Sequence, residues 1–572
     1  MLRSAKAAKV RVLYLTAAIL CVVAVVAAGC GGGSTDSTSS SSPSATAAGE
    51  QPLFRMGAVG SATFDSLNPY NAVSAAALSA FMQMYPALIQ YSADLQPLPD
   101  LAESWTTSAD GKTWTFKLRS DGVWTDGKPI TASDAAFTIN TAVKFKTGVA
   151  AGVSPFIVGI KSASALDPAT LVVETEYPVP ALLANIVNLA ILPEHIWEPL
   201  AGGDGAKLKT LTNDPSKETV VVSGPFTVQT YDPKGTTLFV PVDTFYGQKP
   251  LIKGYGIQLF TNPDAAAQAL KVGDVDAVYP LTAALASSLK SDPKLQVEGL
   301  STMPLTFAVN DYPKYEKHPE LRDVKVREAF DLAIDREQIV NDVYQGFATP
   351  GGSFVYPEYS PAYMSAPLSV PTRDVAKANA ILDELGYAKR GDGIRMADGR
   401  PMEYTVVLWS ARAGDQQRTF GVLKQNLADI GVALKSTMTD NAWGAFIGEP
   451  GENYMAYDAW LVGYVMNPDP DSALVMYSSS MTEAAVSPTG AMNKAYDEAY
   501  QLTQDMDPEA RKAAIDNAVS VLQNEHLEIG LVYWDVLTAW DKRWQNVPDI
   551  GCLFTTPSYL SKAAFVRLAV QE

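Results

Sequence analysis

Residues 101–140 read LAESWTTSADGKTWTFKLRSDGVWTDGKPITASDAAFTIN, and this stretch decides how we predict the fold. Its centre alternates between apolar and polar residues, which is typical of a strand with one buried face. The apolar positions are Trp114, Phe116 and Leu118. Asp-Gly pairs at 110–111 and 126–127 favour tight turns, because both residue types tolerate a positive φ. The stretch therefore predicts a strand bounded by turns.

Capping patterns predict where several helices begin. Thr131 and Asp134 have the spacing of a capping box ahead of an apolar run, and residues 335–338 repeat that pattern. Asp-Pro at 507–508 indicates a cap followed by a first-turn proline. Because predicted helices and strands alternate along the chain, we expect an α/β fold built in layers.

As a string, residues 101–140 resemble the solute-binding proteins of oligopeptide, dipeptide and nickel ABC importers. In that family the pattern LAESW…DG.TWTF.LR.GV.W.DG.P.TA.D..F opens an extra lobe. Other blocks that resemble the family lie at 67–69 (LNP), 192–195 (LPEH), 222–226 (VSGPF), 244–250 (TFYGQKP) and 323–336 (DVKVREAFDLAIDR). The resemblance covers roughly residues 54–550. It implies a three-lobed fold of the type II periplasmic-binding-protein kind, with mixed sheets, flanking helices and a hinge.

The length of 572 residues is too great for one hydrophobic core, so two or three lobes are expected. From the resemblance, lobe I is assigned to residues 53–94, 196–306 and 538–572, lobe II (the extra lobe) to 95–195, and lobe III to 307–537. The formal net charge is −18, and such a surface repels nucleic acid and anionic lipid. We therefore expect no nucleic-acid partner.

Cysteine and histidine are scarce. The chain has Cys21, Cys30 and Cys552, which is too few for a disulfide framework or a thiolate zinc site. Its three histidines are widely spaced in the sequence, so no multi-histidine metal centre and no cofactor are expected.

The N-terminus has the layout of an export signal. A positive segment at 3–11 is followed by an apolar segment at 12–28, and an uncleaved anchor is the alternative interpretation. Ala-Ala-Gly-Cys at 27–30 resembles a bacterial lipobox, which implies a signal peptide at 1–29 and lipidation of Cys30. Residues 30–52 then form a tether, spanning roughly 25 Å for about 20 flexible residues.

The resemblance also implies a solute site between the first and third lobes. The positions that match the ligand-contacting segments of the family are Val73, Ser74, Arg412, Trp443, Gly463, Tyr464, Asn467, Asp469, Tyr533 and Trp534. Peptide-binding members place an Asp ahead of a Y.DP motif to pair with the peptide amino group, whereas in this chain the loop is one residue shorter and has Asn467 nearby. A buried ammonium needs a counter-charge, so either Asp469 supplies it or the solute is not a free peptide. Arg412 could pair with a ligand carboxylate, and a solvated arginine is the favoured alternative.

These patterns lead to one functional prediction. The chain is expected to be an extracytoplasmic lipoprotein that captures an oligopeptide or similar solute by hinge closure and delivers it to an ABC permease. It would be a monomer held at the outer face of the cytoplasmic membrane by its lipid alone. An oligosaccharide or metal-chelate binding protein of the same fold, or a secreted hydrolase, are the alternatives. No motif of a serine hydrolase, zinc protease or P-loop enzyme is present, so no enzyme is predicted. Asp276 is interpreted as a cap for nearby amides.

Overall fold

The computed structural model describes residues 52–59, 64–72, 74–92, 95–146, 149–211, 220–355, 359, 362–365, 369–409, 413–439, 454–463, 467–485, 487–547, 562 and 565–571. The strands are β1 Leu53–Val59, β2 Ile89–Tyr91, β3 Pro97–Pro99, β4 Ala102–Thr107, β5 Thr113–Leu118, β6 Ile160–Asp167, β7 Thr170–Thr175, β8 Phe226–Thr230, β9 Thr236–Pro241, β10 Gly254–Phe260, β11 Ala277–Leu281, β12 Leu295–Val309, β13 Ala348–Pro350, β14 Met396–Ala397, β15 Arg400–Pro401, β16 Glu403–Trp409, β17 Ala433–Thr439, β18 Ala459–Gly463, β19 Ile529–Asp541, β20 Trp544–Gln545 and β21 Ala569–Val570. The α-helices are α2 Ala75–Met84, α3 Ala132–Phe145, α4 Leu182–Ile186, α5 Glu194–Ala201, α6 Ala206–Thr210, α7 Pro263–Val272, α8 Ala283–Leu289, α9 Val324–Ala333, α10 Arg336–Asp342, α11 Val375–Glu384, α12 Ala413–Ala428, α14 Asp471–Leu474, α15 Ser479–Glu483, α16 Lys494–Leu502 and α17 Pro508–Asn524.

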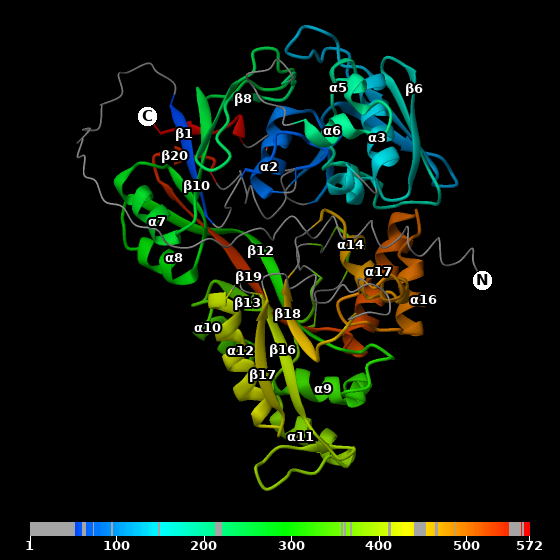
Figure 1. Cartoon of the computed structure of the whole chain (residues 1–572), viewed down its shortest axis with the longest axis vertical. Helices are drawn as coiled ribbons and strands as arrows, with labels where there is room; N and C mark the ends of the chain where they lie inside the picture. Colours follow the sequence, from blue (N-terminus) through cyan, green and yellow to red (C-terminus); the bar gives the residue numbers. More distant parts are fainter. Residues whose placement is uncertain are drawn as a thin grey trace.

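One large sheet runs along the molecule (Figure 1). Its strand order is β17-β16-β18-β12-β19-β11-β1-β10-β9-β8, and β13 also pairs with β19. The upper half of Figure 1 holds β1 and β8–β11 together with α2, and the lower half holds β16–β18 together with α9–α17. The two long strands β12 and β19 lie in both halves.

The pair β12 and β19 changes its surroundings halfway along its length. The strands are antiparallel from Leu295 opposite Asp541 to Phe307 opposite Ile529, with irregularities between Gly299 and Thr302 and between Leu305 and Thr306. The first part of β12 and the last part of β19 pack in the hinge core, which includes Leu295, Val297, Leu537 and Ala539. The other parts pack in the lower core, which includes Met303, Leu305, Trp534 and Val536. The change from one core to the other therefore falls at the first irregularity.

Residues 101–140 supply β4 and β5 of a separate four-stranded sheet, and β6 and β7 complete it. Its order is β4-β5-β7-β6, all antiparallel. The apolar face of β5 is buried as predicted, with Phe116 fully covered. The predicted capping box at the start of α3 is confirmed, because the Thr131 N–H donates to the Asp134 carboxylate at 2.8 Å. This sheet and β1 share one hydrophobic cluster, the upper core, so no separate core divides them.

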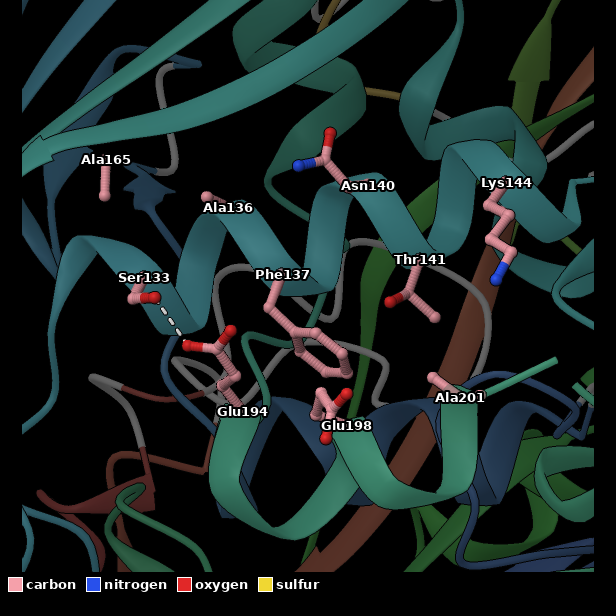
Figure 2. Close-up of a pocket in the computed structure, with 11 residues that line it drawn as sticks. Ser133, Ala136, Phe137, Asn140, Thr141, Lys144, Ala165, Glu194, Glu198 and Ala201 are labelled. Carbon is pink, nitrogen blue, oxygen red and sulfur yellow. Dashed lines mark hydrogen bonds between the residues drawn. The ribbon is translucent and has the colours of Figure 1, made fainter.

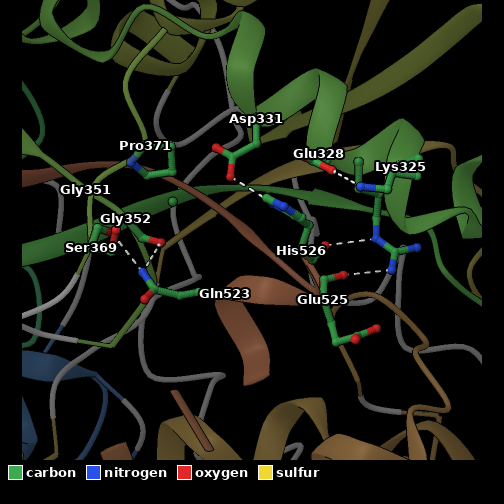
Figure 3. A network of polar contacts seen from close by, with 12 residues as sticks. Lys325, Glu328, Asp331, Gly351, Gly352, Ser369, Pro371, Gln523, Glu525 and His526 are labelled. Atoms are coloured by element: carbon green, nitrogen blue, oxygen red, sulfur yellow. Dashed lines mark hydrogen bonds and ion pairs between the residues drawn. The ribbon is translucent and has the colours of Figure 1, made fainter. Parts of the chain in front are cut away.

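Buried polar contacts hold the start of β19 to the lower half. Arg327 donates to the carbonyl oxygens of Leu321, Glu525 and His526 at 2.9–3.0 Å. The His526 ring lies 2.9 Å from the Asp331 carboxylate (Figure 3). The same carboxylate also pairs with Arg336. The cations of this network hold the pKa of Asp331 below its usual range despite the burial of the carboxyl. The network makes the lower end of β19 a fixed part of its half.

Other local predictions are also confirmed. The Asp335 side chain caps α10 and the Asp507 side chain caps α17, with Pro508 in its first turn. The Asp276 carboxylate accepts the Arg55 N–H at 2.8 Å, as expected of a cap. No helix in the described ranges is long and apolar enough to cross a membrane.

Candidate solute-binding site

The predicted site falls partly outside the described residues. Val73, Arg412, Trp443 and Tyr464 lie outside them, as does the predicted lipidation residue Cys30. The other six predicted contacts are Ser74, Gly463, Asn467, Asp469, Tyr533 and Trp534.

Ser74 is the N-cap of α2. Its hydroxyl accepts the Ala77 N–H at 3.2 Å, and its own N–H donates to the Asp65 carboxylate at 3.2 Å. This arrangement explains why the alanine-rich segment begins its helix here, since a serine oxygen satisfies a first-turn amide that has no partner within the helix. Figure 1 shows α2 at the lower edge of the upper half, on the side that faces α14.

The residues before α14 form a chain of side chain-to-backbone turns. The Asn467 side-chain oxygen accepts the Asp469 N–H at 3.2 Å, and Asp469 in turn accepts the Asp471 N–H at 2.9 Å. The Tyr359 hydroxyl donates to the Asn467 carbonyl oxygen at 2.8 Å. Asn and Asp side chains favour such local bonds, so the alternation of Asn, Asp and Pro in this loop gives it a defined shape.

Asp469 is engaged within the protein. Arg511, on the first turns of α17, binds both of its carboxylate oxygens at 2.7 Å, and Asp469 is only 3% exposed. The guanidinium also lies 5.8 Å from the centre of the Tyr363 ring. Burial of the neighbouring Asp471 carboxyl, together with the charge of Asp469, raises the pKa of Asp471. A ligand ammonium would therefore have to compete with Arg511 for Asp469.

Arg511 was missed by sequence reasoning. It lies 42 residues from Asp469, and nothing in the sequence of an exposed-looking helix start distinguishes it from a solvated arginine. A charged residue such as Asp469 that is predicted to be buried does indicate that a partner of opposite charge lies close to it in the fold. It does not indicate which partner.

Tyr533 and Trp534 lie on opposite faces of β19, because successive residues of a strand alternate. The Tyr533 hydroxyl donates to the Val355 carbonyl oxygen at 2.9 Å. The Trp534 ring is stacked with Tyr344 at 6.4 Å and belongs to the lower core. Both residues are buried, so they pack within the lower half on the two faces of β19.

Gly463 ends β18 and is exposed. A Cβ atom at this position would lie 2.8 Å from the Pro304 carbonyl oxygen of the adjacent strand. The glycine therefore permits the close approach of the two backbones.

A hollow on the surface is lined by residues other than the predicted contacts. It lies between α3 and α5, has a volume of about 540 Å³, and is lined by residues that include Phe137, Thr141, Lys144, Glu194 and Glu198 (Figure 2). Nearby, His195 pairs with Asp126 at 2.6 Å. None of the six described site residues lines this hollow. Within the described part of the chain, no three His, Cys, Asp or Glu side chains come together as a metal site.

Known proteins share this architecture. The oligopeptide-binding protein AppA from Bacillus subtilis, solved with a nonapeptide, superposes with a TM-score of 0.70 at 18% identity, covering 91% of this chain and 100% of that one. NikA from Brucella suis, solved with Fe(III)-EDTA, gives a TM-score of 0.72 at 20% identity, covering 90% and 100%. These structures and the two-strand crossing between the halves define the class: the fold is that of a type II periplasmic binding protein, as predicted.

The family follows from the sequence itself. The model of the bacterial extracellular solute-binding proteins, family 5, matches residues 96–520. A putative ABC transporter peptide-binding protein of Brucella ovis is 26% identical over 424 residues, which is 72% of this chain and 75% of that protein. The chain belongs to family 5 of the bacterial extracellular solute-binding proteins. Because members of this family bind solutes and do not transform them, the prediction that the chain is not an enzyme is confirmed.

Proposed function

We propose that this protein captures an oligopeptide or a similar organic solute between its upper and lower halves and delivers it to an ABC permease. The observation that carries the proposal is the crossing of β12 and β19 between two cores, with its irregularity between Gly299 and Thr302. A pair of strands that changes cores at an irregular step is a natural hinge, because only a few backbone dihedrals need to change there. Solute that contacts both halves only in the closed form then shifts the protein toward closure.

The ten predicted contact residues remain the proposed solute site. Of these, Ser74 caps α2 in the upper half and Asn467 precedes α14 in the lower half. Figure 1 shows α2 and α14 facing each other across the boundary between the two halves. Asn467 is half-buried and already uses its side-chain oxygen within the loop, so its amide N–H groups are the atoms that we assign to solute. They would donate to a carbonyl or carboxylate oxygen of the solute.

A metal chelate is the second candidate solute. The observation that favours it is the Asp469–Arg511 pair, which leaves the Asp469 charge neutralised and poorly suited to bind a peptide amino group. A chelate with carboxylate arms needs hydrogen-bond donors instead. The relatives include proteins named for both kinds of ligand, a nonapeptide complex and an Fe(III)-EDTA complex.

Lipidation of Cys30 and a tether at 30–52 would hold the folded body at the outer face of the cytoplasmic membrane, beside the permease. The protein would act there as a monomer, with the lipid as its attachment to the membrane. Metabolic labelling with a fatty-acid probe tests this part of the proposal, with Cys30→Ser as the control. Label retained in Cys30→Ser would contradict lipidation at this residue.

Solute capture is tested by isothermal calorimetry against panels of peptides, oligosaccharides and metal chelates, with native mass spectrometry of the purified protein for any solute that co-purifies. We expect saturable binding in the micromolar range or tighter by one class of compound. Absence of binding by every class, with turnover of any of them, would overturn the proposal. Asn467→Asp keeps the oxygen that accepts the Asp469 N–H and removes the amide N–H groups, so it should weaken binding of the solute identified in this way.

A further inference from the structure

The two halves also touch each other away from the hinge, through a leucine with an unusual backbone. Leu95 lies in the hairpin that joins β2 to β3, where its N–H donates to the Ser92 carbonyl oxygen at 3.1 Å. Its φ is +59°, a left-handed conformation that Gly, Asn and Asp tolerate but that is unfavourable for leucine. A turn alone would be satisfied better by Gly or Asn at this position. The side chain, which is 2% exposed, must therefore account for the leucine.

The Leu95 side chain does not pack in the core of its own half. Its hairpin neighbours Ile89 and Tyr91 belong to the upper core. Leu95 belongs instead to a cluster of the lower half, the helical core, whose members include Phe354, Tyr359, Met364, Tyr477 and Leu522. The Tyr91 side chain makes a hydrogen bond with the Tyr363 side chain of the same region. The hairpin thus reaches across to the lower half with two side chains.

A residue of the lower half makes the reverse contact. Met506, in the loop between α16 and α17, packs against the upper core. It lies over the turn between β4 and β5, where a Cβ atom on Gly111 would be 2.7 Å from Met506 Cγ. Pro178 lines the same spot, because a Cβ atom on Gly111 would also be 3.1 Å from the Pro178 Cβ. Gly111 has a φ of +68°, so the turn brings bare backbone against the methionine.

We propose that Leu95 and Met506 form a closure latch, in which each half inserts one apolar side chain into the other. The upper and helical cores otherwise remain separate clusters, so the contact is not a continuous hydrophobic seam. Opening the hinge would return both side chains to water, and this cost is independent of any solute. The latch sets the fraction of closed protein before solute arrives and slows the release of solute afterwards. The inference rests on the proposed hinge closure, and it concerns the regulation of that step.

The test uses the full chain with two latch variants and two matched controls. Leu95→Asn removes the apolar side chain and tolerates the positive φ, and Met506→Ala removes the reverse contact. Leu98→Asn is the control in the same hairpin, where the side chain is 43% exposed. Met492→Ala is the control in the lower half, with 45% exposure. Small-angle scattering of solute-free protein measures how open each variant is.

We expect a larger radius of gyration for Leu95→Asn and Met506→Ala than for the wild type and both controls. Once a solute is known, its dissociation should be roughly tenfold faster in Leu95→Asn, since burying a leucine is worth at least that factor. Unchanged scattering and unchanged dissociation in a folded Leu95→Asn or Met506→Ala variant would overturn the latch. If Leu95→Asn does not fold, Met506→Ala decides, because it lies in a loop and is only half-buried.

The two proposals can fail separately. Scattering is measured without solute, so an open latch variant that binds no compound of the panel supports the latch and counts against solute capture. Solute binding with identical scattering and release in all five proteins supports capture and overturns the latch.

Discussion

Glu528 offers the sharpest test of the energetics of the lower half. This residue precedes β19, is 3% exposed, and accepts the Phe354 N–H at 3.2 Å. The hydroxyls of Thr306 and Tyr477 also favour its charged form, but burial outweighs them and raises its pKa from 4.5 to about 8. No cation among the described residues contributes to this balance. The carboxyl is therefore protonated in the folded protein at neutral pH and ionised in the unfolded chain.

The sign of the pH dependence follows from proton counting. Between pH 4.5 and 8 the folded protein holds one more proton at Glu528 than the unfolded chain, so the free energy of unfolding falls as the pH rises. The slope is about 1.4 kcal/mol for each pH unit, and the accumulated loss at pH 7 is about 3 kcal/mol. The dependence vanishes below pH 4.5, where both states are protonated, and above pH 8, where both are ionised.

Glu528→Gln removes this titration while keeping the shape of the side chain. Urea unfolding of both proteins at pH 5, 6, 7 and 8 measures the difference between their free energies of unfolding. We expect the free energy of unfolding of the variant, relative to that of the wild type, to be higher by about 3 kcal/mol at pH 7 to 8 than at pH 5. Glu498→Gln, on the exposed face of α16, is the control and should show no such trend. A constant difference between wild type and Glu528→Gln across this range would refute the reasoning.

Three further substitutions test other parts of the structure. Asp469→Asn leaves Arg511 buried without its bidentate partner, and urea unfolding should show a loss of about 3 kcal/mol. Gly299→Ala places a Cβ atom 2.5 Å from the Asp535 Cβ at the hinge step, so we expect a loss of about 1–3 kcal/mol and altered hydrogen exchange along β12 and β19. Asp134→Ala removes the acceptor of the α3 capping box, and thermal unfolding should show a loss of about 1 kcal/mol.

Two of these variants, Gly299→Ala and Asp469→Asn, have a control within the chain. Gly414→Ala, in α12 with no atom near the added methyl, should be neutral or stabilising, which separates steric conflict from a general effect of glycine replacement. Asp415→Asn, which replaces a half-buried carboxylate paired with Arg418, should cost well under 1 kcal/mol. Stability equal to the wild type in Asp469→Asn would mean that the buried pair contributes nothing, and an unaltered exchange pattern in Gly299→Ala would contradict the placement of the hinge.

Sequence reasoning succeeded where the information is local. The buried face of β5 and the caps of α3, α10 and α17 depend on residues within four positions of one another, so the pattern contains what the structure uses. The extension of β19 as far as Asp541 is not a local effect, because β12 and β11 hold the second part of this strand. Partners that lie far apart in the chain decide that extension.

The candidate site was predicted less completely for the same reason. Family resemblance indicated Asn467 and Asp469 as solute contacts, and this remains a prediction. The pairing of Asp469 with Arg511 is set by the docking of α17 and not by any local pattern. The position of Leu95 in the helical core was equally invisible, because a leucine in a hairpin is ordinarily assigned to the core beside it. The predicted lobe boundaries at 306 and 537 remain predictions, and the cores change between Val297 and Met303 on β12.

The placement of β19 between β11 and β12 has a consequence for how the chain is assembled. When the chain is synthesised from its N-terminus, all the remaining strands of the large sheet are available before residues 529–541 emerge. Until then β11 and β12 are open edges on two unfinished sheets, and neither half can complete its core. We expect final folding to wait until residues 529–541 are available.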